Sequence, residues 1–250
     1  MCEHLVARAS EPFELGALWP MVADLERLGL AGWGWGAAWT TAIGGLASHR
    51  DPRAFRDDPA TGALAATETT SLLVHLRRPS RLSTIGLADT QPFLDPAGRF
   101  AFSHNGDLRR FQARRREYQA AGRIEGRADS EVGQRWLEDH WADDVDATTT
   151  LAALHETFDG QANLMALGAG GDAHVYAGNT ENPVFTFRLG SIGLASTGIY
   201  SLDRSLFRFV VPGARRRHIV RPGQGVTLGA DGHPASPGLE RRPSAATLSG

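Results

Sequence analysis

The sequence predicts an α+β fold built from helices and antiparallel strands. Apolar residues recur at helical spacing in 18–30, 129–141 and 149–158. From residue 162 onward, short apolar runs are separated by Gly, Asn and Pro, which is typical of antiparallel strands. The 250 residues suffice for one large domain or two small ones with a full core. We expect a domain over 2–231 and a disordered tail over 232–250, which is rich in Pro, Ser, Ala and Gly.

The composition excludes several functional classes. Basic residues number 26 and acidic residues 28, so the net charge of -2 gives no basis for binding nucleic acid or an anionic membrane. No apolar stretch reaches the length of a membrane span, and the first residues lack the features of a signal peptide. The single cysteine, Cys2, cannot form an internal disulfide. We therefore expect a cytoplasmic protein with no metal or other cofactor.

Residues 2–9 contain a short apolar stretch and predict a buried first strand that begins at Cys2. The helical pattern of 18–30 stops at Gly32. In Gly32-Trp-Gly-Trp-Gly-Ala-Ala-Trp39, glycine alternates with tryptophan at the period of a strand. This strand fits either a core position with large residues on one face or a pocket wall. Residues 49–62 are polar and rich in Asp and Pro, so we expect a loop there.

The apolar run in 70–80 predicts a strand that is closed by Arg77, Arg78 and Pro79. A guanidinium group at the end of a buried strand suits the binding of a carboxylate, because its rigid fork matches two oxygens. A solvated strand end has the same pattern, so the residues alone leave both interpretations open.

A further strand is predicted over 99–104, ending at Asn105-Gly106, and a helix with five arginines over 107–118. Asn-Gly is usually a tight turn, because both residues tolerate positive φ. A turn between a strand and a helix can also aim an amide side chain and a backbone N–H at one point, as in an oxyanion hole. The arginine-rich helix is most simply a solvated face.

Asp129 lies near the start of the next predicted helix, where a simple capping role explains it without further context. The following helix covers 149–158. Strands are then predicted over 164–167, 174–177, 184–187 and 192–195, with further strands over 207–211, 218–220 and 225–228.

Cys2 directly follows the initiator methionine, so removal of Met1 leaves a thiol and a free α-amine on one residue. A free cysteine titrates at about 8.5 and an α-amine at about 8, so the amine can accept the thiol proton near neutral pH. Such a residue is a nucleophile with its own base. The alternative is that Cys2 is an unremarkable second residue.

Several short motifs occur in a characteristic order: Met-Cys, Gly-Trp-Gly, His75-Leu-Arg77 with Ser80, Gln91-Pro-Phe93, Ser103-His-Asn-Gly-Asp107 and Asp129-Ser-Glu131. This order resembles the class II glutamine amidotransferases, a branch of the N-terminal nucleophile hydrolases. The similarity is specific over about 2–140 and looser through Gly198. Ala31 replaces a common Asp, Gln91 a common His, and Ala128 a common Thr.

The resemblance implies a four-layer αββα sandwich of two antiparallel sheets covered by helices. It also implies the catalytic residues Cys2, Asn105 and Gly106, of which Asn105 and the Gly106 N–H form the oxyanion hole. The substrate-binding residues it implies are Arg77 and Ser80 for the α-carboxylate and Asp129 for the ammonium group.

The resemblance further implies a cysteine-dependent amidohydrolase that cleaves the γ-amide of glutamine or a γ-glutamyl compound, similar to the γ-glutamyl hydrolase of the ergothioneine pathway. The expected partner is this small-molecule substrate, with a synthase partner or a homodimer as further possibilities. Two other hypotheses remain: a glutaminase subunit that delivers ammonia to a separate synthase, and a non-catalytic descendant that binds a ligand. The sequence does not identify the leaving amine.

Overall fold

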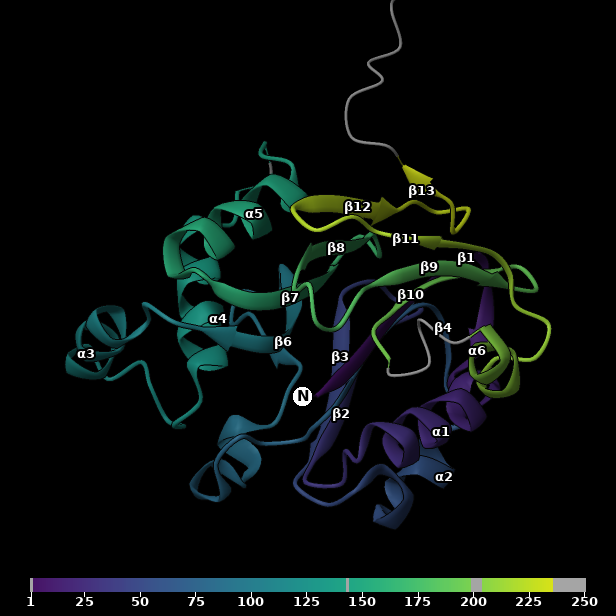
Figure 1. Ribbon diagram of the computed structural model, residues 1–250, viewed down its shortest axis with the longest axis horizontal. Coiled ribbons are helices and arrows are strands. Elements are labelled where there is room, and N and C mark those ends of the chain that lie inside the picture. The colour runs from purple at the N-terminus through teal and green to yellow at the C-terminus, as the bar shows by residue number, and fades with distance from the viewer. Residues whose placement is uncertain (1, 143, 199–203, 236–250) are drawn as a thin grey trace, which may run out of the picture.

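The computed structural model describes residues 2–142, 144–198 and 204–235 (Figure 1). Its helices are α1 (Trp19–Gly29), α2 (Ala60–Leu64), α3 (Gln112–Ala120), α4 (Asp129–His140), α5 (Ala147–Phe158) and α6 (Arg204–Val210). Its strands are β1 (Glu3–Glu14), β2 (Trp35–Thr40), β3 (Leu46–Asp51), β4 (Glu68–Leu76), β5 (Phe93–Leu94), β6 (Phe100–Leu108), β7 (Gly160–Gly168), β8 (Ala173–Gly178), β9 (Phe185–Leu189), β10 (Ile192–Ser196), β11 (Arg215–Ile219), β12 (Gln224–Leu228) and β13 (Pro234–Ala235).

The described strands form two sheets, and their pairings are antiparallel. The first sheet has seven strands in the order β11-β9-β10-β1-β4-β2-β3. The second has six strands in the order β13-β12-β8-β7-β6-β5. β1 therefore lies in the middle of the first sheet.

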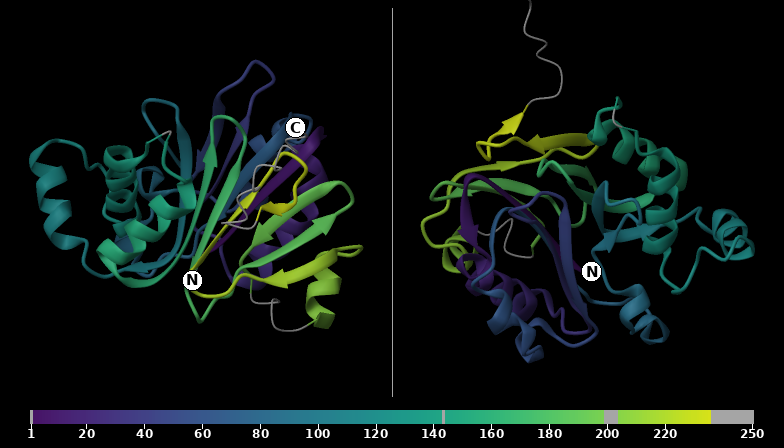
Figure 2. Two further views of the ribbon diagram at one scale, coloured as in Figure 1. Left: turned by 90° about the horizontal axis from the view of Figure 1, so that it is seen from above. Right: turned by 180° about the vertical axis from the view of Figure 1, so that it is seen from behind.

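Three hydrophobic clusters hold four layers together. One cluster joins α1 and α6 to the outer face of the first sheet, and another joins α4 and α5 to the outer face of the second. The third lies between the sheets and includes Val6, Leu73, Met165 and Val175. Figure 2 shows the helices on both outer sides of the paired sheets. This is the predicted αββα sandwich.

Strand alternation directs one set of residues into the space between the sheets. In β1, Leu5 and Ala7 pack under the helices, whereas Val6 faces the second sheet. In β4, Leu73 faces inward, and in β6, Ala101 faces inward. The period of two then places Cys2, His75 and Arg77 on the inner side of the first sheet and Ser103 and Asn105 on the inner side of the second.

The alternating Gly-Trp stretch is a core strand. Trp35 and Trp39 of β2 belong to the cluster under the helices, and Trp35 is fully buried. Gly36 faces the other side, where an added Cβ would overlap the carbonyl oxygen of Gln91. Glycine is needed there because the segment carrying Gln91 lies directly on the strand.

Two expected elements differ from the structure. Residues 49–62 are not only a loop, because β3 extends to Asp51 and α2 begins at Ala60. β3 is an edge strand whose residues are all partly exposed, so its polar composition concealed it. Residues 207–211 are not a strand, because α6 covers 204–210. Phe207 and Val210 are three residues apart and both enter the core, which is a helical and not a strand period.

The Asn105-Gly106 turn was also wrongly predicted. β6 continues through Leu108, and Gly106 pairs with Ala162 of β7. The helix α3 begins only at Gln112. Of the expected tail, Pro234 and Ala235 form β13, while 236–250 lie outside the described residues. Among the helices described, none has the length and apolar character needed to span a membrane.

Candidate active site

Cys2 immediately precedes β1. It lies beside the C-terminal end of β4, the strand with which β1 pairs. Glu3 is opposite Leu76, so Cys2 lies level with the residues that follow β4. Its Sγ accepts a hydrogen bond from the Arg78 backbone N–H at 3.3 Å. Burial raises the pKa of the Cys2 thiol, while the Arg78 hydrogen bond and the nearby Arg77 charge lower it. The thiol is thus held beside a backbone donor and a cation.

Asn105 joins the second sheet to the nucleophile. Its Nδ2 donates to the carbonyl oxygen of Cys2 at 2.5 Å and to Thr197 Oγ1 at 3.2 Å. Its Oδ1 is buried and lacks a hydrogen-bond partner among the residues that the structure describes. Cys2 and Asn105, which are 103 positions apart in the chain, therefore lie in direct contact.

Thr197 continues this network to a buried carboxyl group. Its Oγ1 donates to Glu3 Oε2 at 2.7 Å and accepts from the His4 N–H at 3.1 Å. Burial raises the pKa of Glu3 to about 7. The residue next to the nucleophile thus carries a carboxyl group that titrates near neutral pH.

Gly106 follows Asn105 with φ of 130°, a conformation that side chains with a Cβ rarely adopt. An added Cβ would overlap the carbonyl oxygen of Gln161 on β7. The close approach of β6 to β7 at this point therefore requires glycine.

Arg77 is buried and lies beside Cys2. Its Nη2 donates to Thr84 Oγ1 at 2.8 Å, and its Nη1 is buried without a partner within the described ranges. Ser80, the predicted neighbour, is exposed in the segment after Pro79. Thr84, which no sequence motif indicates, supplies the hydroxyl group that contacts the guanidinium.

Asp129 is the first residue of α4 and links this helix to β6. Its Oδ2 accepts from the Leu108 N–H at 2.7 Å, and its Oδ1 accepts from the Ser130 N–H at 3.0 Å. Part of its surface remains exposed. The charge of Asp129 raises the pKa of the buried His104, although burial has the larger and opposite effect.

Gln91, which stands where relatives often have His, connects these two elements. Its Oε1 accepts from the His104 N–H at 2.6 Å, and its Nε2 donates to the His104 carbonyl oxygen and to Ser130 Oγ. The substitution therefore supplies a bridge between β6, beside Asn105, and α4, beside Asp129.

Two histidines lie on the inner side of the first sheet behind Cys2. His4 and His75 are opposite each other on β1 and β4, and His4 Nδ1 lies 3.0 Å from Ser103 Oγ. Burial lowers the pKa of His75 to about 3 and also strongly lowers the pKa of His4. Both are therefore neutral and weakly basic, so Arg77 is the cation beside the thiol.

A possible metal-ligand set lies elsewhere, where donor atoms of His49, Asp51 and Asp58 come within 4.8 Å of one another. The oxygens of Asp58 already accept from Trp35, Arg53 and the Ala60 N–H, and Asp51 pairs with Arg53. These contacts explain the set as a structural network around an arginine.

The chain matches the family described as class-II glutamine amidotransferases over residues 1–182. Among solved structures, glutamine phosphoribosylpyrophosphate amidotransferase from B. subtilis, complexed with ADP and GMP, matches with a TM-score of 0.71 and 16% identity, covering 92% of this chain and 48% of that one. A structure described as the allosteric regulatory enzyme of purine biosynthesis gives 0.71 and 15%, covering 93% and 48%.

A glutamine aminotransferase class-II domain protein from Silicibacter pomeroyi gives a TM-score of 0.58 and 19% identity, covering 92% of this chain and 96% of that one. The chain thus spans about half the length of the first two proteins. No protein with a curated description matches the chain. These TM-scores show a shared fold, and the family match covers most of the sequence. The chain belongs to the class II glutamine amidotransferases.

Proposed function

We propose that the protein is an amidohydrolase that cleaves the γ-amide of glutamine or of a γ-glutamyl compound through a thioester on Cys2. The observation that carries this proposal is the contact of Cys2 with Asn105 beside the buried Arg77. The Cys2 thiol, the Asn105 amide donor and the Arg77 guanidinium therefore lie close together. Family membership supports amide hydrolysis by a cysteine in general.

In the first half-reaction the α-amine of Cys2, freed by removal of Met1, accepts the thiol proton. The sulfur attacks the γ-carbonyl carbon, and the carbonyl oxygen becomes an oxyanion that Asn105 Nδ2 and the Gly106 N–H stabilise. The amine returns the proton to the leaving nitrogen as the C–N bond breaks. Ammonia or an amine leaves, and a γ-glutamyl thioester remains.

In the second half-reaction a water molecule donates its proton to the same amine and attacks the thioester carbon. The C–S bond breaks, the thiol regains its proton, and glutamate is released. The free Nη1 of Arg77 is suited to the substrate α-carboxylate, with Ser80 or Thr84 nearby, and Asp129 to the ammonium group.

Labelling with the glutamine analogue 6-diazo-5-oxo-norleucine tests the proposal. We expect intact mass and peptide mapping to show loss of Met1 and one adduct on Cys2, with labelling slowed by glutamine but not by asparagine. Cys2→Ala should keep the fold and lose both the adduct and turnover. An active protein that retains Met1, or turnover by Cys2→Ala, would rule the mechanism out.

The Arg77→Ala variant separates substrate binding from thiol reactivity. It should react with iodoacetamide somewhat more slowly than the wild type, because the Arg77 charge lowers the thiol pKa, and its reaction with the glutamine analogue should slow by a much larger factor. Equal losses toward both reagents would mean that Arg77 acts on the thiol and not on the substrate carboxylate.

A further inference from the structure

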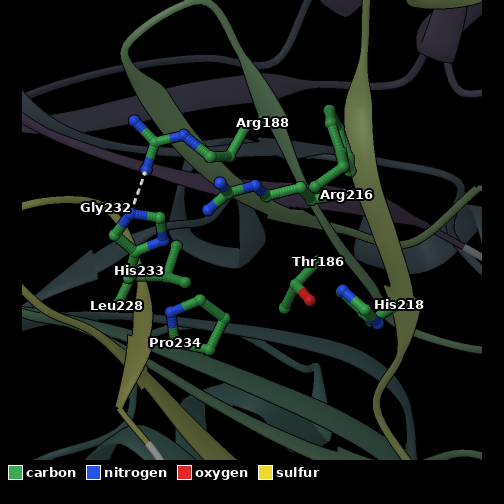
Figure 3. A pocket seen from close by; sticks show the side chains of 9 residues that line it. Thr186, Arg188, Arg216, His218, Leu228, Gly232, His233 and Pro234 are labelled. Atoms are coloured by element: carbon green, nitrogen blue, oxygen red, sulfur yellow. Dashed lines mark hydrogen bonds between the residues drawn. The ribbon is translucent and has the colours of Figure 1, made fainter.

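A second concave site lies between the two sheets, away from Cys2 (Figure 3). One wall comes from β9 and β11 of the first sheet, and the other comes from β12 and the chain leading into β13 of the second. The pocket has a volume of about 170 Å³. This is smaller than the roughly 300–1,000 Å³ of drug-sized ligand sites and suits a small ligand that stays partly exposed to solvent.

Register locates the pocket relative to the nucleophile. Thr186 of β9 is level with Ala195 of β10, which is level with Val6 of β1. The pocket is therefore displaced from Cys2 by about 13 Å along the strands and about 10 Å across the sheet. It is separate from the candidate active site.

The polar lining is strongly basic. Arg188, Arg216, His218 and His233 line the pocket, and none of its lining residues is acidic. Leu228 and Pro234 add apolar surface, whereas the ring of Phe187 packs against Phe207 under the helices. A site of this composition favours an anion that is attached to an apolar body.

Neither arginine is neutralised by a carboxylate within the described ranges. Arg188 donates to the carbonyl oxygens of Asp231 and Ser191 and to His233 Nε2, which holds its guanidinium in place without removing its charge. The side chain of Arg216 has no hydrogen bond or ion pair to another described residue. The nearest acidic neighbour in sequence, Asp231, accepts the His233 N–H with its carboxylate. The positive charge is therefore available to a ligand.

The backbone of β11 is distorted where it presents Arg216. The pairing of β11 with β9 shifts register between Arg215 and His218, and Arg216 has φ of 56°. Arg217 points to the other face, over the rings of Phe185 and Phe207. A bulge re-aims side chains, and a non-glycine residue in the left-handed region stores strain that often accompanies function. Here the distortion directs Arg216 toward the pocket, as Figure 3 shows.

We propose that this pocket is a second ligand site that binds a phosphate monoester with an apolar or aromatic body. The two guanidinium groups and the imidazole N–H groups bind the phosphate oxygens, and Leu228 and Pro234 contact the body. Guanidinium matches phosphate geometry by paired hydrogen bonds, which is why two convergent arginines favour this class of ligand.

Calorimetric titration of the full chain with phenyl phosphate tests the site. We expect saturable binding at one site per chain that weakens with salt, tighter than binding of inorganic phosphate, and none for phenol. Arg216→Gly should weaken phenyl phosphate binding about tenfold or more. Glycine suits the left-handed backbone, so this variant should keep the wild-type melting temperature and glutaminase activity.

Arg116→Ala is the matched control, because Arg116 is an exposed arginine on α3, far from the pocket in sequence. It should bind phenyl phosphate like the wild type. The proposal is overturned if phenyl phosphate shows no saturable binding, if Arg216→Gly binds it unchanged, or if Arg116→Ala weakens binding equally. Equal affinity for phenol would also overturn it, because the apolar body alone would then account for binding.

Discussion

Asn105 Nδ2 donates to the Cys2 carbonyl oxygen at 2.5 Å and thereby joins the second sheet to the nucleophile on the first. The same nitrogen also donates to Thr197 Oγ1, so both amide hydrogens are engaged before substrate binds. An oxyanion at this position must therefore replace one of the two acceptors. Exchange of a neutral acceptor for an anionic one is favourable, because charge-assisted hydrogen bonds are stronger.

Asn105→Asp should test this exchange, because it keeps the size of the side chain and removes its two donors. We expect kcat for glutamine hydrolysis to fall by about 10²–10³-fold, as for loss of an oxyanion donor. The measurement is steady-state kinetics together with a melting curve. A variant that is folded and retains at least half of the wild-type kcat would contradict a role for the amide.

Gly106→Ala should destabilise the protein by more than about 2 kcal/mol. The added Cβ meets the Gln161 carbonyl oxygen in addition to the strained φ of 130°. Gly98→Ala is the control, because Gly98 has φ of 73° but open space around its Cβ position. That variant should cost about 1 kcal/mol in urea unfolding. Equal losses would mean that backbone strain, and not the contact between β6 and β7, is responsible.

Thr84→Val should raise KM for glutamine by up to about tenfold and leave kcat nearly unchanged. It removes the hydroxyl group that accepts from Arg77 Nη2, and one hydrogen bond contributes about 0.5–1.5 kcal/mol. Ser80→Ala is the matched comparison and should have little effect, because Ser80 is exposed. The opposite pair of results would assign the carboxylate-positioning role to Ser80, as the family resemblance implies.

The sequence predicts the buried helices and strands of this fold better than its edge strand and the ends of its strands. The short apolar runs of β7 to β10 and the helical spacing of α1, α4 and α5 are visible because each element buries one face, and burial leaves a period. The edge strand β3 is half-exposed and leaves no such period. Asn105-Gly106 has turn chemistry, yet tertiary pairing with β7 extends the strand through it.

The residues of the candidate site likewise fall into two groups: those that sequence motifs indicate and those that only the fold brings to the site. Motifs locate Cys2, Arg77 and Asn105, because each stands in a short characteristic stretch. Cys2 precedes β1 and Arg77 follows β4, whereas Asn105 lies within β6. Thr84 and Thr197 join them through contacts across 7 and 92 positions of the chain, and only the three-dimensional path of the chain sets these contacts. The sequence around each threonine therefore does not indicate its contact with the site.

Glu3 offers a prediction for the dependence of stability on pH. Burial raises its pKa to about 7 in the folded protein, whereas an unfolded glutamate titrates near 4.3. The folded state therefore binds the proton more tightly, and this contribution is complete below pH 4.3 and is lost as pH rises to about 7. The loss amounts to about 4 kcal/mol of unfolding free energy.

Glu3→Gln should remove this dependence, because an amide resembles the protonated carboxyl and does not titrate. Buried His75 and His4 have lowered pKa values and act in the opposite direction, but they are present in both proteins, so the difference between variant and wild type isolates Glu3. Urea unfolding should show that the advantage of Glu3→Gln grows between pH 5 and about 7 and then levels off. Exposed Glu11, on the same strand, gives the control Glu11→Gln, for which the difference should stay flat. A flat difference for Glu3→Gln as well would show that the Glu3 carboxyl titrates alike in the folded and unfolded chains, because only a pKa difference between these states makes stability depend on pH.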